Sequence, residues 1–189
     1  MQYVVIDEAG PFFLTSQKPR WEQVYILVCV ELVTYRAYLI TMQDATSKNL
    51  IRALEQLQSR RGRVSTIILD ETRSHEVLIN PPGPNILGKL LKSNQASLLT
   101  KAGVSIVMAP GKRHERVGRS ETVVRKVKKV LISCLGSFNF NDSWDFIHQV
   151  SLVEYHLNER PLFFSNSSVL TPNSIEVAML KRSPQSPNP

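Results

Sequence analysis

Three acidic residues are placed where they could hold metal ions. Asp7 closes the apolar run YVVID, Asp70 closes TIILD, and Glu121 opens the basic stretch SETVVRKVKK. Two carboxylates at strand ends and one on a helix can converge although they are far apart in the sequence, and such a set can hold two divalent cations about 3.5–4 Å apart for in-line attack on phosphate. The residues therefore predict a phosphoryl-transfer site.

Positive charge is concentrated beside the third of these residues. The chain has 23 Lys and Arg against 16 Asp and Glu, a formal net charge of +7, and a pI near 9.6. Between residues 111 and 129 there are eight Lys or Arg against two Glu, a local net charge of +6. This favours a polyanionic partner, and we expect Arg119, Arg125, Lys128 and Lys129 to contact DNA phosphates. The alternative is a solvated helix surface.

The elements that must position these residues follow from hydrophobic periodicity. Strands are expected at 3–6, 24–32, 35–42, 64–69 and 104–108, and helices at 46–60, 86–99, 119–135 and 144–158. Strands and helices alternate after residue 42, which favours a mixed sheet flanked by helices, with ligands at the carboxyl ends of parallel strands. Asp7 and Asp70 are expected at such ends.

The helix at 119–135 has the clearest amphipathic pattern. Its expected sheet-facing side contains Val123, Val124, Val127, Val130, Leu131 and Cys134. Glu121, Arg125 and Lys128 follow each other at i, i+4 and i+7, so they share the opposite side. One helix face could therefore bind both metal and DNA.

Length and composition exclude several classes of protein. With 189 residues and 42% hydrophobic content, the sequence predicts one domain over residues 1–180 and a disordered tail at 181–189. The apolar run from Val24 to Val33 is interrupted by Glu31 and is shorter than the roughly 20 residues of a membrane span. No signal peptide opens the chain. We expect a soluble protein of a reducing compartment without a membrane partner.

Cysteine, tryptophan and histidine provide no second chemistry. Cys29 and Cys134 lie in apolar stretches without zinc-site spacing, so both are expected to be buried structural thiols. Trp21 and Trp144 are expected to pack in the interior. The sequence assigns structural or surface roles to His148 and His156, and no soft-metal arrangement to His75 and His114.

Longer segments resemble a known family, the catalytic core of retroviral-type integrases, and in particular those of Bel/Pao-type LTR retrotransposons. VVIDEAGPF resembles the family's first-aspartate strand, VELVTYRAYLITMQDATSKNLIRALEQLQSRRGRVSTIILD its second-aspartate segment, and GRSETVVRKVKKVL its glutamate helix. HLNERPLFF and VLTPNSI are similar to two later segments, through Asn158, Arg160, Pro161, Leu162, Leu170, Thr171 and Pro172. The resemblance runs from about residue 3 to residue 180.

The resemblance implies an RNase H-like fold and an enzyme that trims a DNA end and joins it to target DNA. It implies that Asp7 bridges two Mg²⁺ or Mn²⁺ ions, with Asp70 completing one site and Glu121 the other. It further implies DNA as partner (element ends and target), a homo-oligomer, and a place in the host nucleus within a viral or retroelement nucleoprotein complex.

The sequence departs from the family pattern near its second and third ligands. Asp70-Glu71-Thr72 replaces the usual Asp-Asn-Gly, and Ser120 replaces a tryptophan. The loop from Ala109 to Glu121 is expected to be longer than usual, and Glu115 is an alternative third ligand. Gly118 three residues before Glu121, and the cations four and seven residues after it, favour Glu121.

Other interpretations remain open. One is an integrase-fold DNA-binding or assembly module without catalysis, and another is an RNase H-like nuclease that cleaves without joining. The segment Arg160-Pro161-Leu162 favours the integrases over the nucleases. The family's zinc module and carboxyl-terminal barrel have no counterpart in the sequence, so we expect a fragment or a reduced protein.

Overall fold

The computed structural model describes residues 3–14, 22–44, 46–62, 64–70, 104–109, 114–136, 140, 142–164 and 168–182. At 22, 47, 69, 70, 106, 108, 109, 114–121 and 180–182 it describes the backbone alone. Its strands are β1 (Tyr3–Leu14), β2 (Glu22–Glu31), β3 (Ala37–Met42), β4 (Thr66–Asp70), β5 (Ser105–Ala109), β6 (Phe163–Phe164) and β7 (Val169–Leu170). Its helices are α1 (Ser47–Arg61), α5 (His114–Leu135), α6 (Ser143–Asn158) and α7 (Pro172–Arg182).

Five strands form one mixed sheet in the order β3-β2-β1-β4-β5. β2 pairs antiparallel with both β1 and β3, whereas β4 lies parallel to both β1 and β5. The antiparallel pairs follow from short connections, and the parallel pairs need a crossover, which α1 provides between β3 and β4. The predicted mixed sheet flanked by helices is confirmed.

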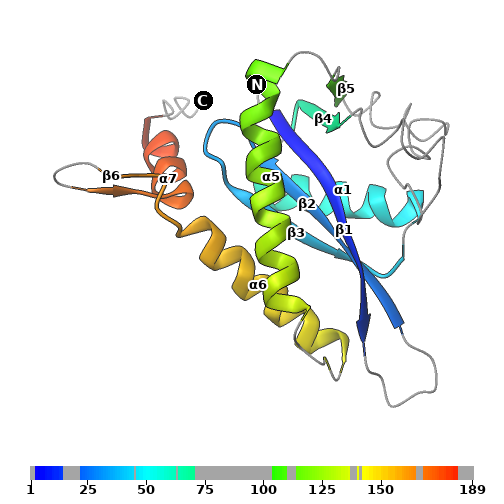
Figure 1. Ribbon diagram of the computed structural model, residues 1–189. Coiled ribbons are helices and arrows are strands. Elements are labelled where there is room, and N and C mark those ends of the chain that lie inside the picture. Colours follow the sequence, from blue (N-terminus) through cyan, green and yellow to red (C-terminus); the bar gives the residue numbers. More distant parts are fainter. Residues whose placement is uncertain are drawn as a thin grey trace, which may run out of the picture.

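Helices cover both faces of this sheet, and strand β2 buries apolar side chains on both. The alternate residues Val24, Ile26, Val28 and Val30 of β2 belong to a core shared with α5 and α6. Tyr25, Leu27 and Cys29, which point the other way along the same strand, belong to a second core shared with α1. Figure 1 shows α5 crossing one face of the sheet while α1 lies on the other. This arrangement produces three layers.

The crossover helix α1 is capped at both ends. The Thr46 side chain accepts a hydrogen bond from the Asn49 backbone N–H, and Gly62, with φ of 82°, ends the helix by donating its N–H to the Gln58 carbonyl at 2.7 Å. Four apolar residues at helical spacing are all buried: Leu50, Ala53, Leu54 and Leu57. Capping and amphipathicity together fix where the chain returns to β4.

Helix α6 closes the open edge of β3. Asn158 and Glu154 hydrogen-bond to the β3 backbone at Ala37 and Leu39. Arg160, just past the helix, donates to the carbonyls of Leu157 and Tyr35. The Asn158 and Arg160 positions of the family-like segment therefore have an architectural role.

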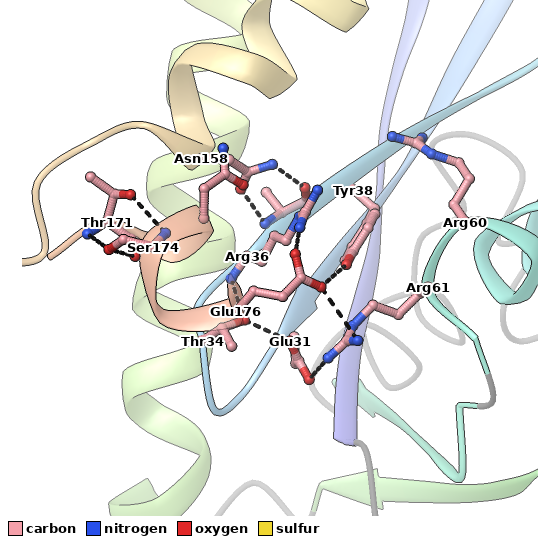
Figure 2. A network of polar contacts seen from close by, with 12 residues as sticks. Glu31, Thr34, Arg36, Tyr38, Arg60, Arg61, Asn158, Thr171, Ser174 and Glu176 are labelled. Atoms are coloured by element: carbon pink, nitrogen blue, oxygen red, sulfur yellow. Dashed lines mark hydrogen bonds and ion pairs between the residues drawn. The ribbon is translucent and has the colours of Figure 1, made fainter. Parts of the chain in front are cut away.

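The last helix, α7, is held to the rest of the protein by charge. Glu176 forms ion pairs with Arg36 and Arg61, and Arg61 also pairs with Glu31. Figure 2 shows Glu176 directed toward Arg36, Tyr38 and Arg61 from the α7 side. The helix starts at Pro172, with the Ser174 N–H donating to Thr171 Oγ1 and the Thr171 N–H donating to Ser174 Oγ. The Leu-Thr-Pro segment is thus a helix-start signal.

Several sequence-based boundaries were too short. β1 extends to Leu14 rather than residue 6, with an irregular register between Ala9 and Phe12. α5 begins at His114 rather than 119, so much of the expected loop before Glu121 is helical. The sequence analysis did not predict β6, β7 or α7. The helix expected at 86–99 lies outside the described residues. Of the tail expected at 181–189, residues 181 and 182 belong to α7 and the rest lies outside the described residues.

Three expectations of burial were wrong. Cys29 is buried as expected, but Cys134 and Val130 are exposed. Both lie beside the row of α5 that faces the sheet, whose buried members are Val124, Val127, Leu131 and Leu135. Trp144 is 77% exposed, because it lies in the first turn of α6 while Phe146 takes the interior position. Trp21 lies outside the described residues.

Candidate active site

Asp7 lies on the face of the sheet that α5 covers. Val5, two residues earlier in β1, packs in the core shared with α5 and α6, and alternation along a strand places position 7 on the same face. Asp7 is half-buried. The expectation that it ends a strand was wrong, since β1 continues for seven residues to Leu14. The pairing of β1 with β4 ends at Ile6, one residue before Asp7.

The carboxylate of Asp7 has two described contacts. Its Oδ1 accepts the backbone N–H of Glu8 at 2.8 Å, and its Oδ2 accepts Lys128 Nζ at 2.9 Å. Lys128 comes from the middle of α5, so this contact joins the central strand to the covering helix. Charge-assisted hydrogen bonds of this length are among the stronger polar contacts in proteins.

Asp70 comes next to Asp7 through strand register. The last described pair between the parallel strands β1 and β4 is Ile6 with Leu69. Asp7 and Asp70 directly follow these partners, and Asp70 is the final residue of β4, as expected. The backbone therefore brings the two aspartate positions together at the point where the strands part. The Asp70 side chain lies outside the described part.

The two candidate glutamates both lie in α5, and only their backbone is described. Glu121 precedes Lys128 by seven residues, about 10.5 Å along the helix axis, and Glu115 precedes it by thirteen, about 20 Å. Helical side chains lean toward the amino terminus, so the Lys128 ammonium and its partner Asp7 lie on the Glu121 side of the Lys128 backbone. The helix geometry favours Glu121 over Glu115, and the choice stays a prediction.

The basic residues of α5 divide into two environments. Arg125 and Lys129 are exposed, whereas the Lys128 side chain is only 14% exposed because it reaches Asp7. Of Arg119 only the backbone is described. Sequence reasoning placed Lys128 on the face of Glu121 but missed its contact with Asp7. The one signal in the sequence was the position of Lys128 seven residues after Glu121, which places this lysine on the same helix face as a proposed metal ligand.

The donor chemistry fits a hard divalent cation. Asp7 and the neighbouring Asp70 position supply carboxylate oxygens, which suit Mg²⁺ and Mn²⁺. Oδ2 of Asp7 is paired with the ammonium of Lys128 in this structure. Among the residues with described side chains, which do not include Asp70 and Glu121, no group of three His, Cys, Asp or Glu could hold a metal ion.

Comparison with known proteins identifies the fold. No family model matches the chain, and no curated protein matches its sequence. Among solved structures, the catalytic core domain of BIV integrase superposes with a TM-score of 0.61 at 16% sequence identity, covering 97% of this chain and 98% of that one. The chain has the fold of a retroviral integrase catalytic core. The expected RNase H-like architecture is thereby confirmed.

Two further integrase cores have the same fold. The HTLV-2 integrase catalytic core domain in complex with magnesium matches in a trimeric form, with a TM-score of 0.52, 17% identity, and coverage of 92% of this chain and 94% of that one. Its dimeric form matches with a TM-score of 0.51, 16% identity, and coverage of 92% and 93%. In the described part of the chain, no helix is long and apolar enough to cross a membrane.

Proposed function

We propose that this protein is an integrase-like enzyme that processes DNA 3′ ends and joins them to target DNA. The observation that carries the proposal is the meeting of Asp7 and Asp70 where β1 and β4 part, beneath a basic helix, on an integrase-core fold. Asp70 is the last residue of β4, and the ends of parallel strands in α/β folds commonly present functional groups. The proposed family remains the Bel/Pao type, supported by the order of the sequence segments around Asp7, Asp70, Glu121 and Asn158.

In this proposal Asp7, Asp70 and Glu121 hold two Mg²⁺ or Mn²⁺ ions. When bound, the ions activate a water or a 3′-hydroxyl and neutralise charge on the leaving oxygen. The Glu8 N–H fixes Oδ1 of Asp7, which leaves the orientation of that carboxylate defined before a substrate arrives. Arg119, Arg125, Lys128 and Lys129 take the phosphates of the DNA, with an affinity that depends on salt and little on sequence.

The proposed partners follow from the same family. They are the DNA of element ends and of the target, and further copies of the chain. The HTLV-2 core in its dimeric and trimeric forms supports self-association, and its complex with magnesium supports the choice of ion. The proposed place of action is the host nucleus, within a viral or retroelement nucleoprotein complex.

The test is Mn²⁺-dependent strand joining on a branched DNA that resembles an integration product. We expect wild type to produce the joined strand. Activity should fall by at least about a hundredfold in each of three variants, Asp7→Asn, Asp70→Asn and Glu121→Gln, because each variant removes the charge of one proposed metal ligand. Glu115→Gln, the matched control in the same helix, should retain it. Loss with Glu115→Gln alone would move the third ligand to Glu115, and activity unchanged by Asp7→Asn would reject the proposed mechanism.

A second candidate is a DNA-binding or assembly module without catalysis. The departure at Asp70-Glu71-Thr72 and the neutralisation of Asp7 by Lys128 favour it. It predicts tight DNA binding by wild type with no product in the joining assay. A third candidate, an RNase H-like nuclease, predicts cleaved but never joined products from the same reaction.

A further inference from the structure

The ion pair between Lys128 and Asp7 lies inside the proposed metal site. Lys128 Nζ is 2.9 Å from Asp7 Oδ2, and the two side chains are 14% and 16% exposed. Partial burial weakens screening by water and salt, so the pair attracts more strongly than a surface ion pair would. A positive charge therefore already neutralises the carboxylate that is proposed to bridge the metal ions.

Lys128 and a metal ion would compete for the same oxygen. Oδ1 of Asp7 is engaged by the Glu8 N–H, and Oδ2 receives the ammonium. A divalent cation bound to Oδ2 at ordinary Mg²⁺–oxygen distance, about 2.1 Å, would lie within a few ångströms of the ammonium. Two like charges so close in a partly buried site repel each other, so the bound cation weakens the attraction between Asp7 and the ammonium.

We propose that Lys128 is an internal counter-ion that occupies Asp7 in the metal-free protein and is expelled when a divalent cation binds. This inference rests on the proposed function. The expelled side chain belongs to the same helix as the exposed Arg125 and Lys129, so its charge joins theirs and becomes available to a DNA phosphate. Cation binding and DNA binding are then coupled, and by linkage each strengthens the other to the same degree.

The first test measures Mn²⁺ affinity without DNA, by calorimetry or by the electron paramagnetic resonance of free Mn²⁺. Lys128→Gln removes the competitor, so its Mn²⁺ affinity should rise about tenfold over wild type, the size expected for losing one charge-assisted contact. Lys128→Arg keeps the charge and should remain near wild type. Lys126→Gln, which removes an exposed lysine two residues away, controls for net charge and should change affinity less than twofold.

The outcomes separate the inference from the proposed function. Equal Mn²⁺ affinity of wild type, Lys128→Gln and Lys126→Gln would overturn the counter-ion role while leaving the metal site intact. Equal gains in Lys128→Gln and Lys126→Gln would also overturn it, because charge alone would explain them. Failure of both wild type and Lys128→Gln to bind Mn²⁺ would overturn the metal site and the inference together.

A second test reports the position of the lysine itself. Acetylation of Lys128 by a limiting reagent, followed by mass spectrometry, should be slow in the metal-free protein and several-fold faster with Mg²⁺. In Asp7→Asn the rate should no longer respond to Mg²⁺. Lys129, exposed beside it, provides the internal reference. If Mg²⁺ did not change the acetylation rate of Lys128 in wild type, the ion pair would persist in the presence of the cation and the proposal would be overturned.

Discussion

The side chain of Asn158 forms two hydrogen bonds with the backbone of Ala37. Its Nδ2 donates to the Ala37 carbonyl at 2.8 Å, and its Oδ1 accepts the Ala37 N–H at 2.8 Å. Glu154, one turn earlier in α6, accepts the Leu39 N–H at 2.7 Å. Ala37 and Leu39 belong to the edge strand β3, whose backbone groups would otherwise need a further strand or water. Helix α6 therefore takes the place of a sixth strand.

Replacing Asn158 with alanine should destabilise the protein by about 2–4 kcal/mol, because a buried donor and a buried acceptor lose their partner. Urea unfolding followed by circular dichroism measures this loss. Ser151→Ala, on the exposed side of the same helix, is the control and should change stability by less than about 0.5 kcal/mol. A similar small effect of Asn158→Ala would contradict the edge-closing role.

Helix α7 should detach when its buried charge is removed. Among its residues with described side chains, only Pro172 and Glu176 are buried, so the ion pairs of Glu176 with Arg36 and Arg61 are its main described anchor. Glu176→Gln removes the carboxylate of Arg36 and one of the two carboxylates of Arg61, and should cost about 2–4 kcal/mol of local stability.

Hydrogen exchange of the α7 amides measures that change. They should exchange much faster in Glu176→Gln, while the amides of β2 stay protected. Glu55→Gln, at an exposed position of α1, is the matched control. Unchanged α7 exchange in Glu176→Gln would mean that other contacts hold the helix.

The two cysteines should differ sharply in reactivity. Burial, and to a lesser extent the negative charge of Glu154, raises the pKa of the Cys29 thiol well above its usual range, whereas Cys134 is exposed. Because the thiolate is the reactive form, iodoacetamide at pH 8 should label Cys134 in the native protein and Cys29 only after unfolding. Peptide mapping distinguishes the two. Rapid native labelling of Cys29 would show that the core opens far more readily than its packing implies.

Stability should fall at alkaline pH partly through Tyr38. Burial raises the pKa of Tyr38 above its usual value near 10, outweighing the opposing effect of Arg36 and Arg61. Below pH 10 the phenol is neutral in both states, so its contribution is complete. As pH rises from 10 through the folded-state pKa, the unfolded chain releases the proton first, and stability decreases by up to about 1.4 kcal/mol per pH unit.

Tyr38→Phe should therefore lose less stability than wild type between pH 10 and 11. Urea midpoints at a series of pH values measure the difference. Tyr155→Phe, at an exposed position, should follow the wild-type curve. If the urea midpoints of wild type and Tyr38→Phe fell in parallel as the pH rises, the loss of stability at alkaline pH would come from groups other than Tyr38.

The exposed basic residues of α5 should each set part of the salt dependence of DNA binding. If Arg125 neutralises one phosphate, Arg125→Gln should reduce the slope of log affinity against log salt by about one, with little change in sequence preference. Fluorescence anisotropy on duplex DNA measures the slope. Lys48→Gln, an exposed site on α1 across the sheet, should leave it unchanged. An equal effect of both variants would indicate a diffuse attraction instead of a contact by α5.

The sequence predicted local elements well wherever one periodic pattern dominated. The helix expected at 46–60 and the mixed sheet were both correct. It failed where long-range contacts decide the outcome: the second half of β1 is a strand because β2 pairs with it as far as Glu22, which no local pattern reveals. Pairing between distant residues also decides the site. Local periodicity cannot show that Lys128 reaches Asp7, or that Asn158 closes an edge.

The length of α5 has one more consequence. Its 22 residues form a continuous helix, and a helix of that size is about 33 Å long. That is close to the rise of one turn of B-form duplex, about 34–36 Å. If α5 is the DNA-facing element, as proposed, a single copy can follow no more than about one helical turn along it. Any longer footprint would have to come from a second copy or from another part of the chain.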